Sequence, residues 1–180
     1  MAYLLNNIES KRILFRAIDR NDYDHWLPFF QDKSSFQYWV GELQSPEGEC
    51  TKWYEKQFGR YTNQLGGMNA LIEKTSGKLI GHAGLLVQTV DGNEELEVAY
   101  SLLAAFRNRG FATEAAIRCK EVAFENSWRD SLISIISVTN TPSTNVAIKN
   151  GMKVEKQTLY NQNHVSIFRI SKENWRHQSH

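Results

Sequence analysis

A strand pattern runs directly into a helix pattern around "RNRGFATEA", residues 107–115, and this junction constrains the fold more than any other feature of the sequence. The preceding "ELEVAYSL" alternates as a strand does, with Leu96, Val98, Tyr100 and Leu102 on one face. After the junction, small and apolar side chains recur at helical spacing: Ala112, Ala115, Ala116, Cys119, Val122 and Ala123. Small side chains let a helix approach a sheet closely, so the pattern predicts a helix packed on a sheet.

The same junction has the chemistry of an anion site. Backbone N–H groups at a helix N-terminus lack intrahelical partners and lie at the positive end of the dipole, so they bind phosphate oxygens. Gly110 lets an anion come close, and Thr113 offers a hydroxyl. Arg107 and Arg109 add positive charge, although an ordinary helix start with two solvated arginines accounts for the same residues. Two other phosphate loops are excluded, because the chain lacks Gly-Lys-Ser/Thr and has no GxGxxG after its first strand.

The periodicity of the chain predicts the element order β-α-α-β-β-β-α-β-α-β-β. Strands are expected at 11–18, in a hairpin over 68–90 that turns at 75–78, and at 95–102, 131–140, 153–160 and 163–171. Asp19 is expected to cap the first helix, and Gly66 or Gly67 to end the second. Thr141 is expected to cap a helix that begins at Pro142. The sequence predicts one α/β domain over 1–180, with an ordered core of about 10–172 and a polar tail at 173–180.

Composition excludes several classes of function. The chain is 41% hydrophobic and 23% charged with a net charge of +1, which is ordinary for a globular protein and gives no indication of nucleic-acid binding. Cys50 and Cys119 fit no zinc spacing, so we expect no metal and a reducing, cytoplasmic setting. The first residues lack a signal-peptide pattern, and no apolar run approaches the roughly 18 residues of a membrane span. We therefore expect neither secretion nor a membrane partner.

The junction also resembles a known phosphate-binding loop. Arg107–Ala112, "RNRGFA", matches the Arg/Gln-x-x-Gly-x-Gly/Ala loop with which the GNAT N-acetyltransferase superfamily binds acetyl-coenzyme A. The stretches "GKLIGHAGL", "ELEVAYSLLAAFRNRGFATEA" and "NTPSTNVAIKNGMK" resemble, in order and spacing, signatures of the subgroup that contains the ribosomal-protein alanine N-acetyltransferases. Both ends of the chain, "ESKRILFRAIDRNDYDHW" and "HVSIFRISKENW", are similar to that subgroup. The resemblance thus covers nearly the whole chain.

This resemblance implies a fold, an activity and a set of binding residues. The fold is a single-domain GNAT fold, a central mixed, mostly antiparallel sheet flanked by helices. The activity is direct transfer of the acetyl group of acetyl-coenzyme A to the primary amine of a protein N-terminus or small molecule, in a ternary complex without an acyl-enzyme. The resemblance also allows a homodimer. The implied cofactor-binding residues are Leu102, Leu103, Arg107, Asn108, Arg109, Gly110, Phe111, Ala112, Thr113 and Asn140.

The acceptor amine must lose a proton before it attacks, and Glu97 is the candidate base. It lies on the strand before the loop, on the face opposite Leu96 and Val98, and matches an acidic position of the subgroup. A carboxylate is a weak base for an ammonium, so it would act through ordered water or with a pKa raised by desolvation. A solvated or ion-paired strand residue is the ordinary alternative. His82, between glycines on a strand, is the rival base and more often a structural residue.

The leaving thiolate needs a proton or a hydrogen bond. Many members of the superfamily place a tyrosine for this purpose where this chain has Ala147, so the usual acid is in doubt. Ser143, in Asn140-x-x-Ser143, matches the serine that the alanine-acetyltransferase subgroup is thought to use. A serine at a helix start also serves simply to satisfy backbone groups.

The acceptor itself stays open in the sequence. Phe36, Tyr38, Trp39 and Trp53 lie where this family builds its acceptor site, and they line a pocket or belong to the core. Two other functions compete with acetyl transfer. One is a non-catalytic acyl-coenzyme A-binding module, and the other is a nucleotide- or phosphopeptide-binding domain that uses the same helix terminus.

Overall fold

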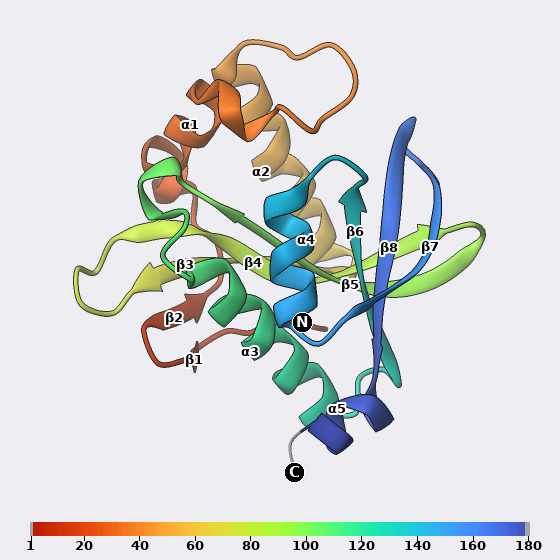
Figure 1. Ribbon diagram of the computed structural model, residues 1–180. Coiled ribbons are helices and arrows are strands. Elements are labelled where there is room, and N and C mark those ends of the chain that lie inside the picture. Colours follow the sequence, from red (N-terminus) through yellow and green to blue (C-terminus); the bar gives the residue numbers. More distant parts are fainter. Residues whose placement is uncertain (1, 179–180) are drawn as a thin grey trace.

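The computed structural model describes residues 2–178, which form an eight-stranded sheet with helices on both faces (Figure 1). The strands lie in the order β1-β2-β3-β4-β5-β6-β8-β7. Their bounds are β1 Ile8–Glu9, β2 Ile13–Arg16, β3 Gly66–Glu73, β4 Leu79–Val90, β5 Asn93–Leu102, β6 Ser131–Ser137, β7 Lys153–Tyr160 and β8 Asn163–Ser171. Neighbouring strands are antiparallel except β5 and β6, which are parallel. The predicted mixed, mostly antiparallel sheet is confirmed.

Helices and apolar side chains cover both faces of this sheet. The helices are α1 Tyr23–Gln31, α2 Pro46–Thr62, α3 Phe111–Glu125, α4 Thr141–Lys149 and α5 Lys172–Gln178, with 3-10 turns η1 Arg20–Asp22, η2 Lys33–Ser35 and η3 Ala104–Phe106. On one face, the predicted small-residue stripe of α3 packs over β4 and β5 in a core that includes Leu85 and Leu96. On the other face, α1 and α2 enclose Trp26, Phe30 and Tyr54. No helix among residues 2–178 is long and apolar enough to cross a membrane.

The two halves of the sheet meet at a single residue pair. β5 pairs with β4 along its whole length, from Asn93 to Leu102, and β6 pairs with β8 throughout. Between β5 and β6 the only register pair in the described residues is Glu97 with Ile133. Beyond that pair the two strands diverge toward their carboxyl ends, where β5 leads into α3 and β6 into α4 (Figure 1). This divergence leaves β5 with a free edge beside the junction.

Two helix boundaries differ from the sequence predictions. α2 ends at Thr62, because Asn63 forms the C-cap, so Gly66 and Gly67 begin β3 instead of ending the helix. Asn140, not Thr141, caps α4: its Oδ1 accepts a hydrogen bond from the N–H of Ser143 at 3.1 Å.

Near both ends of the chain, the structure has elements that the predicted order lacks. Asp19 caps η1, a 3-10 turn that precedes α1, and a two-residue strand β1 comes before β2. Within the predicted polar tail, residues up to 178 belong to α5, and residues 179–180 lie outside those described. The hairpin over β3 and β4, the helix after Arg109, and strands β7 and β8 are confirmed.

Close approach of β3 and β4 makes Gly84 a sensitive position. A Cβ atom at Gly84 would lie 2.1 Å from the carbonyl oxygen of Gly67, so Gly84→Ala forces the strands apart. We expect the free energy of unfolding, measured in urea, to fall by about 1–3 kcal/mol. The matched control is Gly59→Ala on α2. A Cβ atom at Gly59 would meet nothing within 4 Å outside its own helix backbone, so the free energy of unfolding should stay unchanged or rise by up to about 1 kcal/mol. Equal stability of the two variants would contradict the close approach.

Candidate active site

The junction forms a loop whose backbone is suited to an anion. Asn108 and Gly110 both have left-handed backbone conformations, with φ of 59° and 81°. Gly110 is the N-cap residue of α3 and brings no side-chain cap hydrogen bond. The N–H groups of the first turn of α3 therefore stay open at the positive end of the helix dipole. The loop thus has the backbone geometry that an anion site needs, and anion binding there stays a prediction.

Arg107 is held within the protein. Its Nε donates to the carbonyl of Leu102 at 3.0 Å, and its Nη1 pairs with Asp32 Oδ2 at 3.1 Å. The hydroxyls of Ser34 and Ser35 also accept from this guanidinium, each at 2.7 Å. Arg107 thereby fastens the turn after α1 to the end of β5 and orients the loop that follows.

Arg109 lies open beside the helix terminus. Its guanidinium is 51% exposed, pairs with Glu73 at 3.3 Å, and lies over the ring of Phe111 at 5.1 Å. Arg12, far away in the sequence, supports the same loop: its Nη1 donates to the carbonyl of Arg109 at 3.0 Å, and its Nε pairs with Glu114 at 2.7 Å. Only tertiary structure brings Arg12 here, and no local pattern identifies it in the sequence.

A cavity of about 650 Å³ adjoins the loop. It is lined by Glu9, Ser10, Lys11, Gly110, Thr113, Glu114, Ile117, Arg118, Glu121 and Lys149. The cavity thus joins the turn between β1 and β2 to the first three turns of α3 and the end of α4. Gly110 and Thr113 border it directly, so an anion on the loop would have room for a further group on this side, close to Lys11 and Lys149.

The free edge of β5 ends at Leu102 and Leu103. Leu103 donates its N–H to the carbonyl of Ile80 at 3.0 Å, and the carbonyl of Leu102 accepts from Arg107. Closer to the point of divergence, the Ser134 hydroxyl donates to the carbonyl of Val98 at 2.8 Å. These contacts fix the backbone on either side of the opening between β5 and β6.

Glu97 lies at the point where β5 and β6 part. Gln88 Nε2 donates to its carboxylate at 2.7 Å, while Gln88 Oε1 accepts from Arg60 at 2.8 Å and from Tyr160 at 3.1 Å. Burial raises the pKa of Glu97. The hydrogen bonds from Gln88 and from the backbone of Ile135, together with the nearby cations, lower it less than burial raises it. A carboxyl with a raised pKa is a stronger base than an ordinary glutamate.

His82 is enclosed in the aromatic core. It is 0% exposed and its ring contacts those of Trp26 and Trp53, with centroids 4.3 and 4.6 Å apart. Burial lowers the pKa of His82 to about 3, and neither ring nitrogen has a hydrogen-bond partner in the described chain. A general base must reach the proton that it removes, so this enclosure favours Glu97 over His82.

The first turn of α4 faces β5 across the opening. Ser143 is partly buried there, and its carbonyl accepts a hydrogen bond from the Tyr100 hydroxyl at 2.9 Å. The Oδ1 of Asn140 accepts the helix-cap hydrogen bond from the N–H of Ser143. Ala147 is 1% exposed and belongs to the core between α3 and the sheet. Two hydroxyls, those of Ser143 and Tyr100, are therefore near the opening from this side.

The predicted acceptor aromatics divide between core and surface. Phe36 packs on Phe29 and Phe30, and Trp53 packs on Trp26 and His82. Trp39, by contrast, is 47% exposed. The carbonyl of Tyr38 accepts from Asn163 Nδ2 at 3.0 Å, which joins the segment between α1 and α2 to the turn between β7 and β8.

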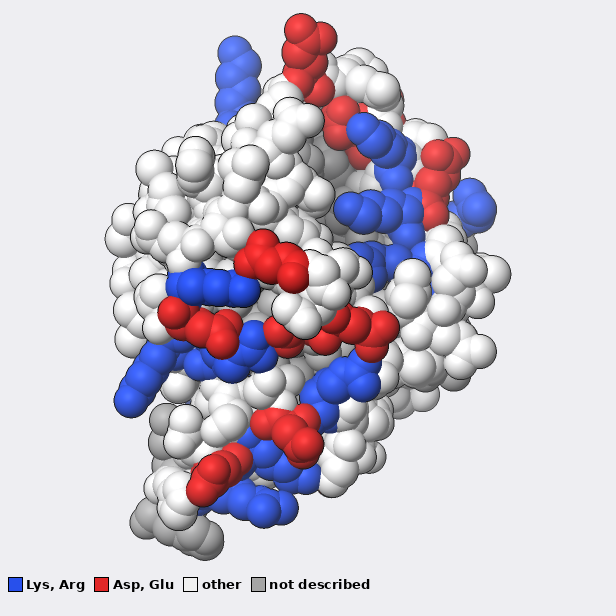
Figure 2. Space-filling model, turned by 90° about the vertical axis from the view of Figure 1, so that its right-hand side faces the viewer, with Lys and Arg blue, Asp and Glu red and all other residues white. Residues whose placement is uncertain are grey.

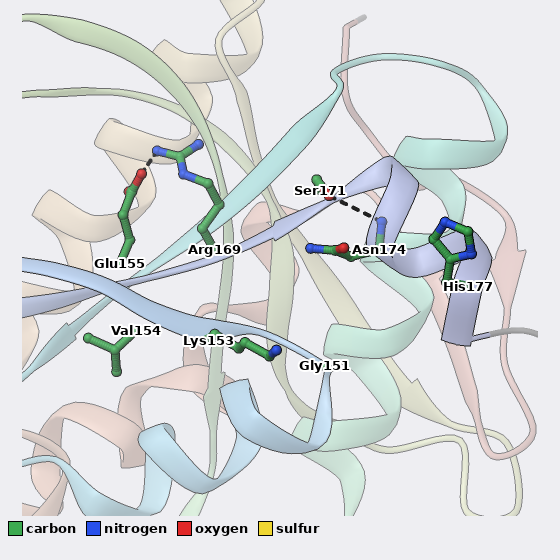
Figure 3. A pocket seen from close by; sticks show the side chains of 8 residues that line it. All are labelled: Gly151, Lys153, Val154, Glu155, Arg169, Ser171, Asn174 and His177. Carbon is green, nitrogen blue, oxygen red and sulfur yellow. Dashed lines mark hydrogen bonds and ion pairs between the residues drawn. The ribbon is translucent and has the colours of Figure 1, made fainter.

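A second cavity, of about 410 Å³, lies at the other end of the molecule between β7, β8 and α5 (Figure 3). Arg169 is its strongest potential anion-binding group, but Glu155 and Glu95 pair with it at 3.0 and 2.6 Å. Lys153 and His177 also line this cavity. We place the candidate active site at the junction instead, because α3 begins there with open N–H groups, whereas Arg169 is paired with two carboxylates. No cluster of three or more His, Cys, Asp or Glu side chains suited to a metal occurs within residues 2–178.

The structure brings the predicted residues together around one opening. The loop of residues 107–113, the end of β5, Glu97 and the start of α4 all border the divergence of β5 and β6. The residues that the sequence did not single out are Arg12, Arg60, Gln88, Tyr100 and Tyr160, and all of them reach the site through side-chain contacts that only the fold creates.

The chain is similar to known proteins over most of its length. A model of the acetyltransferase (GNAT) domain family matches residues 12–153. YnaD, an uncharacterized N-acetyltransferase of Bacillus subtilis strain 168, is 28% identical over 153 residues, which cover 83% of this chain and 84% of YnaD. An acetyltransferase structure from Agrobacterium tumefaciens strain C58 matches with a TM-score of 0.77 and 18% identity, over 94% of this chain and 96% of that one. RimL, a ribosomal L7/L12 alpha-N-protein acetyltransferase solved with coenzyme A, matches with a TM-score of 0.72 and 14% identity, over 92% of this chain and 97% of that one.

The family match spans most of the chain, so this protein belongs to the acetyltransferase (GNAT) family. The predicted enzyme class, an acetyltransferase with acetyl-coenzyme A as co-substrate, is thereby confirmed, and the two solved structures confirm the fold.

Gly110 offers a direct test of the loop. Gly110→Asp sets a carboxylate where we expect the pyrophosphate of acetyl-coenzyme A, and we expect its affinity, measured by calorimetry, to fall at least about tenfold. Gly92→Asp is a matched control, because Gly92 has nearly the same φ of 80° but lies in the open turn between β4 and β5. Both variants should unfold at similar temperatures. Unchanged affinity of Gly110→Asp would refute the loop assignment.

Proposed function

We propose that this protein acetylates the primary amine of a protein N-terminus or small molecule, by direct attack of that amine on acetyl-coenzyme A in a ternary complex. One observation carries the proposal: an uncapped helix N-terminus and a partly buried carboxyl group with a raised pKa both lie beside the divergence of β5 and β6. The helix terminus supplies donors for the cofactor, and the carboxylate supplies a base for the acceptor.

The residues at the junction fit coenzyme A. The open N–H groups of α3 suit its pyrophosphate, and the exposed guanidinium of Arg109 adds charge. The adjoining cavity, with Lys11 and Lys149, has room for the adenosine end. We propose that the pantetheine lies along the end of β5 at Leu102 and Leu103 as an added strand would, using backbone groups other than the Leu103 N–H and the two carbonyls, which bond to Ile80, Phe106 and Arg107. When bound, the cofactor supplies the activated acetyl group, and Arg107 keeps the loop in place around it.

Glu97 is the proposed base. An ammonium must be deprotonated before attack, and the ordinary pKa is about 8 for a peptide N-terminus and about 10 for an alkylamine. Burial raises the pKa of Glu97 toward these values, which makes proton transfer less unfavourable than to an exposed glutamate. Its hydrogen bond from Gln88 keeps the carboxylate in one orientation at the opening.

Ser143 is the proposed acid for the leaving thiolate. It lies in the first turn of α4, with Tyr100 bonded to its carbonyl. The thiols of Cys50 and Cys119 are both buried, and burial raises the pKa of Cys50 to about 11 and that of Cys119 to about 12. A thiol that stays protonated is a poor nucleophile, which supports direct transfer without an acyl-enzyme.

A second candidate is a non-catalytic acyl-coenzyme A-binding module. The buried Ala147 favours it, because it stands where the resemblance to the superfamily implies a tyrosine in many members. Release of free thiol from acetyl-coenzyme A, followed across a panel of peptides and small amines, separates the two candidates. Amine-dependent release supports the transferase, and tight cofactor binding without release on any amine supports the module.

The proposal also includes a cytoplasmic location and a homodimer. The free thiols of Cys50 and Cys119 support the cytoplasmic location.

Replacing the base should make turnover depend on the free amine in solution. For Glu97→Gln we expect kcat/KM for the amine to fall about a hundredfold at pH 7 and less above pH 9, where deprotonated amine is abundant. The wild-type profile should rise with pH as Glu97 loses its proton, at a pH above the ordinary glutamate range because its pKa is raised. Glu94→Gln, exposed on the same strand, is the control. The same loss at every pH would mean that Glu97 positions the acceptor and does not take its proton.

Replacing the acid should slow the chemical step alone. For Ser143→Ala we expect kcat to fall about tenfold or more, while the dissociation constant for acetyl-coenzyme A changes less than about twofold. Thr144→Ala, one residue further along the helix, is the control. If Ser143→Ala keeps its kcat and Tyr100→Phe loses it, the proton comes from Tyr100 and the assignment to Ser143 is wrong.

A further inference from the structure

A row of three cations follows the edge of α2 that leads to Glu97. Lys52, Lys56 and Arg60 are spaced four residues apart, so they stand one above another on the helix. Arg60 bonds only to uncharged groups, the carbonyls of Leu65 and Val87 and the amide of Gln88. Within residues 2–178, neither Lys52 nor Lys56 has an ion pair or a side-chain hydrogen bond. Within the described residues the row thus has no direct ion pair.

These cations act on one another and on the candidate base. Desolvation lowers the pKa of Lys56, the charges of Arg60 and Lys52 lower it further, and Glu97 raises it. Glu97 is therefore the carboxylate coupled to the row. Glu49, one turn before Lys52, is buried and accepts from the N–H of Gln44 at 3.0 Å instead. Figure 2 shows lysine and arginine side chains beside a hollow in one face of the molecule, with acidic side chains next to them.

The length of the row matches a short peptide. Arg60 comes eight residues after Lys52, which is a rise of about 12 Å along the helix axis. An extended peptide covers that distance with about three to four residues, at roughly 3.3 Å each. The exposed Trp39, Val40 and Leu43 lie in the segment that Tyr38 joins to the β7–β8 turn, so apolar surface is also available to a large acceptor.

We propose that the acceptor is a protein N-terminus followed by acidic residues, whose carboxylates pair with Lys52, Lys56 and Arg60 while the terminal amine reaches Glu97. The inference rests on the proposed function and specifies its substrate class. Charge complementarity selects such an acceptor and rejects a basic one, because a cationic peptide would be repelled along the whole row. The same cations favour the unprotonated form of the arriving amine, which is the form that attacks.

Two peptides of identical length test this proposal. One carries Asp or Glu at positions 2–4, and the other carries Asn or Gln there. We expect wild-type kcat/KM to be about tenfold higher for the acidic peptide at low ionic strength, with the ratio shrinking toward one as salt screens the charges. In Lys52→Gln/Lys56→Gln the ratio should fall to about two or less. Lys153→Gln/Lys172→Gln, with the same change of net charge at the opposite end of the molecule, should keep the wild-type ratio.

The outcomes are distinct. A wild-type ratio of one or below, or a ratio that survives in Lys52→Gln/Lys56→Gln, would overturn the acidic peptide as acceptor. Acetylation of small anionic amines such as aspartate without acetylation of any peptide would also overturn it, while the proposed transfer stands. Cofactor binding without turnover on any peptide or small amine would overturn the proposed function itself.

Discussion

The single backbone pairing between β5 and β6 is the constraint on which the site depends. Because Glu97 and Ile133 form the only register pair between these strands in the described chain, the sheet stays continuous at that point and opens beyond it. The residue whose backbone makes this pair also carries the proposed base. The Ser134 hydroxyl on the carbonyl of Val98 holds the strands just past the pair. The opening and the carboxylate are therefore positioned by one local feature.

The loop beside this opening is held in place by charges drawn from distant parts of the chain. Arg107 binds the turn after α1, and Arg12 binds both Glu114 and the carbonyl of Arg109. These contacts fix the loop without capping α3, because Gly110 has no side chain to do so. Glycine at the N-cap forgoes only a few tenths of a kcal/mol, roughly, relative to Ser or Asp, and the open N–H groups that result are what an anionic cofactor needs.

The fold could be predicted from the sequence wherever the signals were local. The hairpin of β3 and β4 has a Gly-containing turn, β7 and β8 are separated by a short polar turn, and α3 follows a glycine, so each boundary is marked by its own residues. The ends of α2 and α4 were misplaced because Asn63 and Asn140, and not the glycine and threonine nearby, satisfy the terminal backbone groups. β1 and α5 are short, and packing decides them more than propensity.

The site residues likewise divide into those that the local sequence predicts and those that only the fold brings together. The loop of residues 107–113 is contiguous and was predicted as a unit, whereas the network around Glu97 joins Arg60 from α2, Gln88 from β4 and Tyr160 from β7. No spacing rule links such positions. The sequence indicated Arg107 as an anion ligand, and only the fold reveals that its donors bind Asp32, Ser34 and Ser35.

Amide hydrogen exchange with and without saturating acetyl-coenzyme A tests the central claim most directly, since it reports which backbone groups the cofactor covers. The claim is that the cofactor lies in the opening between β5 and β6, with its pyrophosphate on the N-terminus of α3. We predict slower exchange in residues 98–103 and 111–114, and no change around the cavity between β7, β8 and α5. Protection confined to that second cavity, or no protection in either place, would contradict the account.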